Sequence, residues 1–278
     1  MKLQPVVAGQ FYPGTSKSLQ AALDRMEKEL AVEPLKGEPA ALLLPHAGYP
    51  YSGAVASLGY RSIPQDVETV VIVGPSHYLS FKGVSLFAGE AVLTPLGELA
   101  VDQEVCRFLT DFDGHIAEIP PAFAREHSVE VHFPLVQKYL PRAKVVPLVM
   151  GQGRAEAVKP LAEALLALRA KRKFLLVVSS DLSHYPKYET ATQADRSFLE
   201  ALLTGDEKKV DQTDEKIMAE GYPDYYCTHC GKEPVSTLLK FAKGVQAEKI
   251  QLLAYRNSGD VTKDHSRVVG YAAVAFCR

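Results

Sequence analysis

Three short apolar runs in this chain each end in a loop that carries a histidine, and this repetition constrains the fold more than any other feature. The runs span residues 41–44, 70–73 and 174–178. Each is long enough for a buried strand and too short for a helix. The loops that follow contain His46, His77 and His184 among small and turn-forming residues.

If the three strands lie side by side and run parallel, their loops meet at one edge of the sheet. Ligands of open α/β sheets bind in the crevice beyond the carboxyl ends of the strands. We therefore expect His46, His77 and the pair Asp181/His184 to converge. Each of these histidines, taken alone, is more simply interpreted as a hydrogen-bonded surface or half-buried residue. Because the pattern of a buried strand followed by a histidine loop occurs three times, we favour a common functional site.

Composition is that of an ordinary globular protein and argues against several classes. Of the 278 residues, 47% are hydrophobic and 23% charged, and the formal net charge is −2. This charge gives no sign of a nucleic-acid or membrane partner. The first residues form no hydrophobic signal region, no apolar run approaches the roughly 18 residues of a membrane span, and the four cysteines do not make a disulfide framework. We therefore expect a cytoplasmic protein.

Strand-like and helix-like segments alternate along the chain, an order that predicts an α/β fold. The sheet should be mostly parallel or mixed, with helices on both faces. Helical patterns cover 16–31, 53–60, 102–108, 155–169, 189–203, 206–219 and 233–243. Further strand patterns cover 84–87, 91–93, 145–150, 250–255 and 268–276. The period of 126–134 fits either a strand or the first turns of a helix.

The histidine loops have the composition of a metal site. Imidazole is the commonest protein ligand for divalent transition metals, and two histidines with one anionic ligand form many non-haem iron sites. His46 and His77 would be the neutral nitrogen ligands. The candidates for the anionic third ligand are Cys230, Asp181 and Glu126.

The segment around Cys230 admits several interpretations. Cys230 directly precedes a predicted helix, whose dipole would favour the thiolate form as a metal ligand or a nucleophile. As a nucleophile it would need a base such as His184, in a hydrolase without metal. Cys227 and Cys230 also form a Cys-x-x-Cys pair that, with a nearby histidine, would make a zinc clip. A single pair of this kind is a weak zinc signal.

Two acid–histidine pairs are candidates for proton transfer. Asp181 and His184 lie three residues apart in one loop, so the carboxylate could orient the ring for general acid/base work. The alternative is an Asx-type turn with a solvated histidine. Glu126 and His127 offer the same choice with a weaker case, because their backbone conformation is ambiguous. The other histidines are assigned no site role: His115, His132, His229 and His265.

Together, these motifs resemble the Memo-like family, whose microbial members are often called AmmeMemoRadiSam system protein B. The resemblance covers nearly the whole chain, and so many motifs in one order are very specific. They lie at 5–13, 45–49, 51–53, 74–77, 94–97, 126–130, 179–184, 230–231, 257–260 and 269–272.

The resemblance implies one α/β domain over residues 1–278, similar to the extradiol (class III) dioxygenases that use non-haem iron. The positions that match the metal pocket are His46, His77 and Cys230, with Asp181 and His184 beside them. The dioxygenases have a glutamate where Cys230 stands. A thiolate is a softer ligand that changes the potential of the metal and is itself oxidisable, so ordinary ring cleavage is not the expectation.

Two functions follow from these expectations. The first is a metal-dependent redox enzyme that uses iron(II), or copper as an alternative, on O₂ or a small oxidisable substrate, with zinc as a further candidate occupant of the site. His184, oriented by Asp181, would be the acid/base. The second is a binding module that keeps the pocket, catalyses nothing and holds a peptide against His46, His77 and nearby tyrosines. The resemblance also implies radical SAM and AMMECR1-like proteins as partners of the microbial members.

Overall fold

In residues 1–151 and 154–278, which a computed structural model of the chain describes, eight strands form the main sheet and three form a smaller one. The main sheet has the order β10-β11-β2-β9-β3-β8-β4-β7, and the smaller sheet has the order β1-β5-β6. The strands are β1 (Lys2–Leu3), β2 (Pro39–Leu44), β3 (Thr69–Pro75), β4 (Val84–Leu86), β5 (Ala91–Thr94), β6 (Gly97–Ala100), β7 (Ile116–Ala117), β8 (Lys144–Met150), β9 (Leu175–Ser179), β10 (Lys249–Asn257) and β11 (Gly270–Cys277).

The three strands that precede the histidine loops lie side by side and parallel. β9 pairs with β2 on one side and with β3 on the other. Their apolar runs are continuous because both faces of the sheet are covered, as is usual for parallel strands. The predicted arrangement is therefore confirmed, and it brings the three loops to one edge. β11 runs antiparallel to β2 and ends opposite its first residue, so the carboxyl terminus lies at the other edge.

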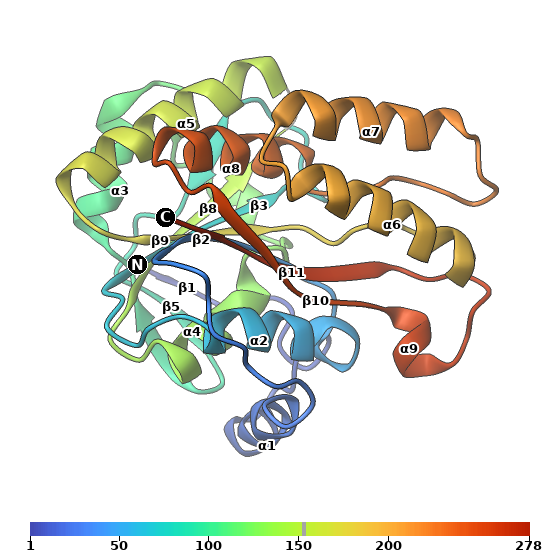
Figure 1. The fold of residues 1–278 in the computed structure, drawn as a ribbon. Coiled ribbons are helices and arrows are strands. Elements are labelled where there is room, and N and C mark those ends of the chain that lie inside the picture. The colour runs from blue at the N-terminus through green and yellow to red at the C-terminus, as the bar shows by residue number, and fades with distance from the viewer. Residues whose placement is uncertain (152–153) are drawn as a thin grey trace.

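Helices flank the sheet on both faces, so the chain forms a mixed α/β domain (Figure 1). α5 and α8 pack together, and α8 lies against the central strands β2, β3 and β9. On the opposite face α2 packs on β2, β10 and β11 and contacts α4. The helices are α1 (Ser16–Met26), α2 (Ala54–Arg61), α3 (Gln103–Phe112), α4 (Phe133–Tyr139), α5 (Arg154–Lys171), α6 (Tyr188–Leu202), α7 (Glu207–Ala219), α8 (Lys232–Gly244) and α9 (Ser258–Thr262).

Three details differ from the sequence-based expectations. α1 ends at Met26 instead of near residue 31, and Thr15, not Ser16, caps it by accepting a hydrogen bond from the backbone N–H of Ser18. The strand expected at 91–93 forms, but it belongs to the smaller sheet. The ambiguous segment 126–134 contains no strand: a loop leads into a 3₁₀ turn, η3 (Glu130–His132), and then into α4.

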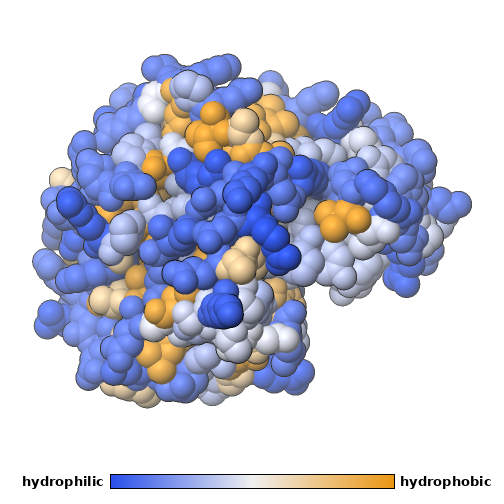
Figure 2. Space-filling view, turned by 90° about the horizontal axis from the view of Figure 1, so that it is seen from below, coloured by the Kyte–Doolittle hydropathy of each residue, from blue (hydrophilic) through white to orange (hydrophobic). Residues whose placement is uncertain are grey.

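The face of the molecule in Figure 2 is largely hydrophilic, with hydrophobic side chains in small separate groups. It is indented beside the lobe on the right, the side on which Figure 1 shows α6, α7 and α9. Within the described residues, none of the helices combines the length and the apolar character that a membrane crossing requires.

Candidate metal centre

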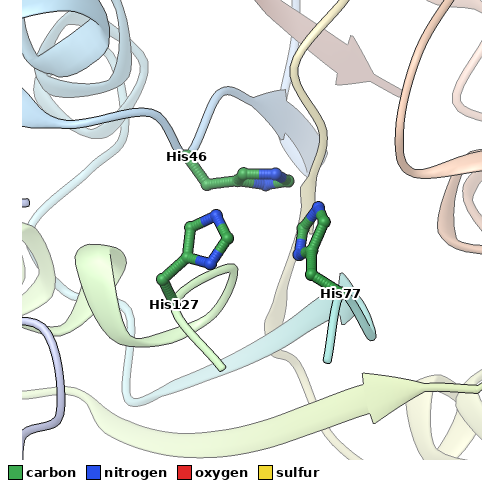
Figure 3. Close-up of side chains that lie close together, drawn as sticks. All are labelled: His46, His77 and His127. Atoms are coloured by element: carbon green, nitrogen blue, oxygen red, sulfur yellow. The ribbon is translucent and has the colours of Figure 1, made fainter. Parts of the chain in front are cut away.

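Three histidine rings face one another at the carboxyl edge of the sheet (Figure 3). His46 follows β2 and His77 follows β3, while His127 comes from the loop before η3. One ligand nitrogen from each ring lies within 4.8 Å of the others. The ring centroids are 5.1 Å apart for His46 and His77 and 4.6 Å apart for His77 and His127. Two of the three are the histidines that the strand–loop repetition predicts.

Ser179, the last residue of β9, fixes the protonation of His46. Its hydroxyl donates to the Ser128 carbonyl over 2.6 Å, so its single hydrogen is used. The oxygen must therefore accept from its two other neighbours, His46 Nδ1 at 2.7 Å and His132 Nε2 at 2.9 Å. His46 thus carries its proton on Nδ1. Burial, first of all, lowers the pKa of His46 well below its usual value, so the ring is neutral and Nε2 has a free lone pair.

Glu126 holds the ring of His77 through the Nδ1 proton, as Ser179 holds that of His46. Its Oε1 accepts a hydrogen bond from His77 Nδ1 at 2.8 Å, which leaves the lone pair of His77 on Nε2. The carboxylate also accepts from the backbone N–H groups of His77, His127 and Ser128. Burial alone would raise the pKa of Glu126, but the hydrogen bonds and charge of His77, with these N–H groups, hold it below its usual value. Glu126 is therefore placed to orient a ligand rather than to be one.

Cys230 completes the same pocket from the loop before α8. Its Sγ lies 3.2 Å from His46 Nε2 and 3.8 Å from the Asp181 carbonyl oxygen. The following residue, Gly231, lets this loop approach the end of β9 closely, since a Cβ there would be 2.7 Å from the Cβ of Ser180. Donors that share one metal at about 2.0–2.3 Å lie roughly 3–4 Å apart. The sulfur and the imidazole nitrogen meet this spacing.

These donors fit a transition metal. Three imidazoles lie within ligand distance of one another, the thiol of Cys230 adjoins one of them, His46, and two of the rings have their second nitrogen held by a serine or a carboxylate, which is the usual outer shell of a metal-binding histidine. The Nδ1 atom of His127 is buried and has no hydrogen-bond partner among the described residues. Burial and the neighbouring His77 lower the pKa of His127 to about 4, so this ring is also neutral near pH 7.

Comparison with known proteins shows the family of this chain. The profile of the family described as "Memo-like protein" matches residues 4–275. A MEMO1 family protein of Methanobrevibacter smithii is 34% identical over 289 aligned residues, which cover 99% of this chain and all of the relative. Another, from Methanopyrus kandleri, is 33% identical and aligns over the full length of both chains. The chain belongs to the Memo-like family.

A solved structure with some likeness is that of an uncharacterized protein from Escherichia coli K12. It has 15% sequence identity and a TM-score of 0.49, and the match covers 84% of this Memo-like chain and 99% of the other.

Asp181 and His184 lie beside the pocket, but they do not form the predicted pair. Asp181 Oδ1 accepts the backbone N–H groups of His46 and Ala47, at 2.7 and 3.2 Å, and so fixes the start of the His46 loop. His184 Nδ1 donates instead to the Leu182 carbonyl at 2.7 Å. The backbone oxygen thus orients this ring through Nδ1 and leaves Nε2 without a hydrogen bond to that carbonyl. Burial raises the pKa of Asp181, and the charge of a protonated His184 opposes that rise.

The expectation that the helix dipole makes Cys230 a ready thiolate is not met in the metal-free pocket. Burial and the Asp181 carboxylate raise the pKa of Cys230 well above its usual value. The imidazole nearest to its sulfur is that of His46, not His184. A hydrolase with Cys230 as nucleophile and His184 as base therefore loses its support. In the described part of the chain, the metal-sized cluster is that of the three histidines and includes neither Cys227 nor Cys230, so a zinc clip built on this cysteine pair finds no support either.

Sequence reasoning missed three members of this Memo-like site. His127 received a weak case as a proton-transfer residue, His132 was assigned no role, and Ser179 was not singled out. The polar run Glu126–Ser128 next to apolar residues is the signal that could have found His127. For Ser179 and His132 the sequence holds no such signal, because their roles depend on distances between segments that are far apart in the chain.

Proposed function

We propose that this protein binds a transition metal, the redox-active iron(II) first and copper second, with zinc as an alternative that has no redox chemistry, between His46, His77 and Cys230, with His127 as a further ligand. One observation carries the proposal: the two rings whose Nδ1 protons are held by Ser179 and Glu126 turn their Nε2 lone pairs toward a common space beside a thiol. Iron or copper, once bound, would supply electron transfer to or from an oxidisable substrate or O₂.

The residues around the pocket have separate tasks in this proposal. Ser179 and Glu126 hold two ligand rings in the required tautomer. Asp181 holds the backbone of the His46 loop. His184, whose ring is fixed by a hydrogen bond from Nδ1 to a backbone carbonyl, is the group that would accept a proton from a bound substrate on Nε2. The substrate would be a small oxidisable molecule.

The ligand set is tested with cobalt(II) as a spectroscopic probe on metal-free protein. Cobalt bound to a thiolate absorbs in the near ultraviolet by charge transfer, so wild type should show this band and Cys230→Ser should lose it. His127→Ala should bind cobalt more weakly but keep the band. His115→Ala is the matched control, because this exposed ring is paired with Asp113 outside the site. Full cobalt binding without the band in wild type would remove Cys230 from the ligand set.

A binding module without catalysis is the second candidate, and one observation favours it: Tyr51, five residues after His46, is 43% exposed. Tyr49, by contrast, is buried and donates its hydroxyl hydrogen to the Val131 carbonyl, so it does not offer a contact surface. This candidate predicts affinity for a peptide that survives removal of metal. A cytoplasmic location and partnership with radical SAM and AMMECR1-like proteins remain predictions.

A further inference from the structure

Two tyrosines follow site histidines directly and point outward with an arginine on each ring. Tyr78 comes after His77 and Tyr185 after His184, and the two are 49% and 42% exposed. The guanidinium carbon of Arg125 lies 4.9 Å from the centre of the Tyr78 ring. The same distance separates Arg267 from the Tyr185 ring. Stacking on an aromatic face holds a guanidinium in place while its N–H edge stays free for a ligand.

The backbone of Tyr185 is strained, which shows that its placement is specific. Its φ angle is +72°, in the left-handed region that costs a residue with a side chain of the order of 1 kcal/mol or more. The conformation is held by a hydrogen bond of 2.7 Å from its N–H to the Val268 carbonyl. This turn sets the His184 and Tyr185 rings edge to face, with their centroids 5.6 Å apart, and places Tyr185 under the guanidinium of Arg267.

Arg267 is a cation without an ion-pair partner among the described residues. Asp264 lines the same cavity, and the hydrogen bonds from the hydroxyl and N–H of Ser266 to its Oδ1 lower the pKa of this carboxyl group. These hydrogen bonds hold the carboxylate on Ser266 instead of on Arg267. A guanidinium that is fixed in position, faces a cavity and has no carboxylate partner is suited to bind an anion.

The cavity beside Arg267 has a volume of about 310 Å³, and its link to the site is through Val269 rather than through a histidine in its lining. Val269 forms one wall, and this residue pairs with His184 in an isolated antiparallel bridge. Tyr51 and Tyr271 line it as well, so aromatic surface accompanies the charge. A ligand in this cavity would therefore touch Arg267 while it lies against the segment that carries His184.

We propose that Arg267, stacked on Tyr185, binds the anionic group of a small organic acid, a carboxylate or a phosphate monoester, in the cavity that Val269 borders. Tyr51 and Tyr271 would contact the planar body of that molecule. The anion site needs no metal; only the statement that the other end of the molecule reaches the histidines rests on the proposed function. The inference thus names the class of substrate for that site.

Calorimetric titration of metal-free wild-type protein with three probes tests the anion site. Benzoate and phenyl phosphate differ in the anionic group, and neutral benzamide lacks it. We expect saturable binding of at least one anion, about tenfold tighter than that of benzamide, because a fixed guanidinium forms charge-assisted hydrogen bonds. The tighter of the two anions decides between carboxylate and phosphate. Equal binding of benzamide and both anions, or no saturable binding up to about 10 mM, would overturn the proposal.

Variants locate the site. Arg267→Gln should weaken anion binding about tenfold, and Arg267→Lys, which keeps the charge but loses the planar fork, should weaken it less. Arg142→Gln is the matched control, an exposed arginine just before β8 at the opposite edge of the sheet, and should bind as wild type does. Unchanged binding by Arg267→Gln would refute the assignment.

Two further measurements separate this inference from the proposed function. Arg267→Gln should bind cobalt(II) as wild type does, and His46→Ala should bind benzoate or phenyl phosphate as wild type does. If wild type binds the anions through Arg267 but no metal at all, the proposed function fails and the anion site stands.

Discussion

Asp195 is a buried carboxyl group whose proton should make the stability of the protein depend on pH. It lies on α6 with no solvent exposure and accepts hydrogen bonds from the Ser183 N–H at 3.0 Å and the Tyr255 hydroxyl at 2.8 Å. Burial, first of all, raises its pKa from 3.8 to about 7. At 1.36 kcal/mol per pKa unit, this difference corresponds to about 4 kcal/mol.

The sign follows from the protons bound in each state. Below pH 3.8 both the folded and the unfolded chain hold the proton, and Asp195 does not affect stability. Between 3.8 and about 7 the folded chain holds it and the unfolded chain has lost it, so the free energy of unfolding falls as pH rises. Above about 7 both are ionised, and the loss of up to about 4 kcal/mol stays constant.

The substitution Asp195→Asn isolates this effect, because asparagine fills the same space and does not titrate. Urea unfolding followed by circular dichroism should give a stability difference, variant minus wild type, that rises between about pH 4 and pH 7 and then levels off. The other carboxyl groups titrate in both proteins, so their contributions cancel in the difference between the two free energies of unfolding. Tyr255→Phe removes the hydroxyl that donates to the ionised Asp195 carboxylate. It should therefore raise the pKa of Asp195 and extend the pH range over which the free energy of unfolding falls. A difference that does not change with pH would refute the reasoning.

Three further substitutions probe the packing and the outer shell of the site. Gly270→Ala would place a Cβ 2.0 Å from Asp195 Oδ2, and we expect about 1–3 kcal/mol of destabilisation in urea unfolding. Ser179→Ala leaves three buried partners without their shared hydroxyl, among them the His46 ring, and should cost about 1–3 kcal/mol in the same assay. Glu126→Gln should weaken metal binding about 10–100-fold in a competition titration, and an unchanged affinity would contradict its role.

The convergence of His46 and His77 could be predicted from the sequence because it depends on local features. Short apolar runs indicate buried strands, and parallel neighbours bring their carboxyl ends to one edge. Neither step needs to know the order of the strands in the sheet. The position of Cys230 was predicted with them, through the resemblance to the Memo-like family and its place before α8.

The partners of these residues could not be predicted, because they follow from contacts across the chain. Ser179 meets the His46 and His132 rings only because β9 lies between β2 and β3. Asp181 and His184 are close in sequence, but the tight turn brings the Leu182 carbonyl nearer to the ring than the carboxylate is. The spacing of residues along a loop therefore predicts that these groups lie near one another, but it does not predict their hydrogen-bond partners.

The metal content of protein purified without oxygen tests the central claim most directly. Mass spectrometry should find about one iron or copper per chain in wild type and in His115→Ala, and only a small fraction of that in His46→Ala. Loss in His46→Ala alone would assign the metal to the histidine pocket. A wild-type protein that is empty and stays empty when iron(II) and copper are offered, or a His46→Ala variant that keeps its full metal, would contradict the account.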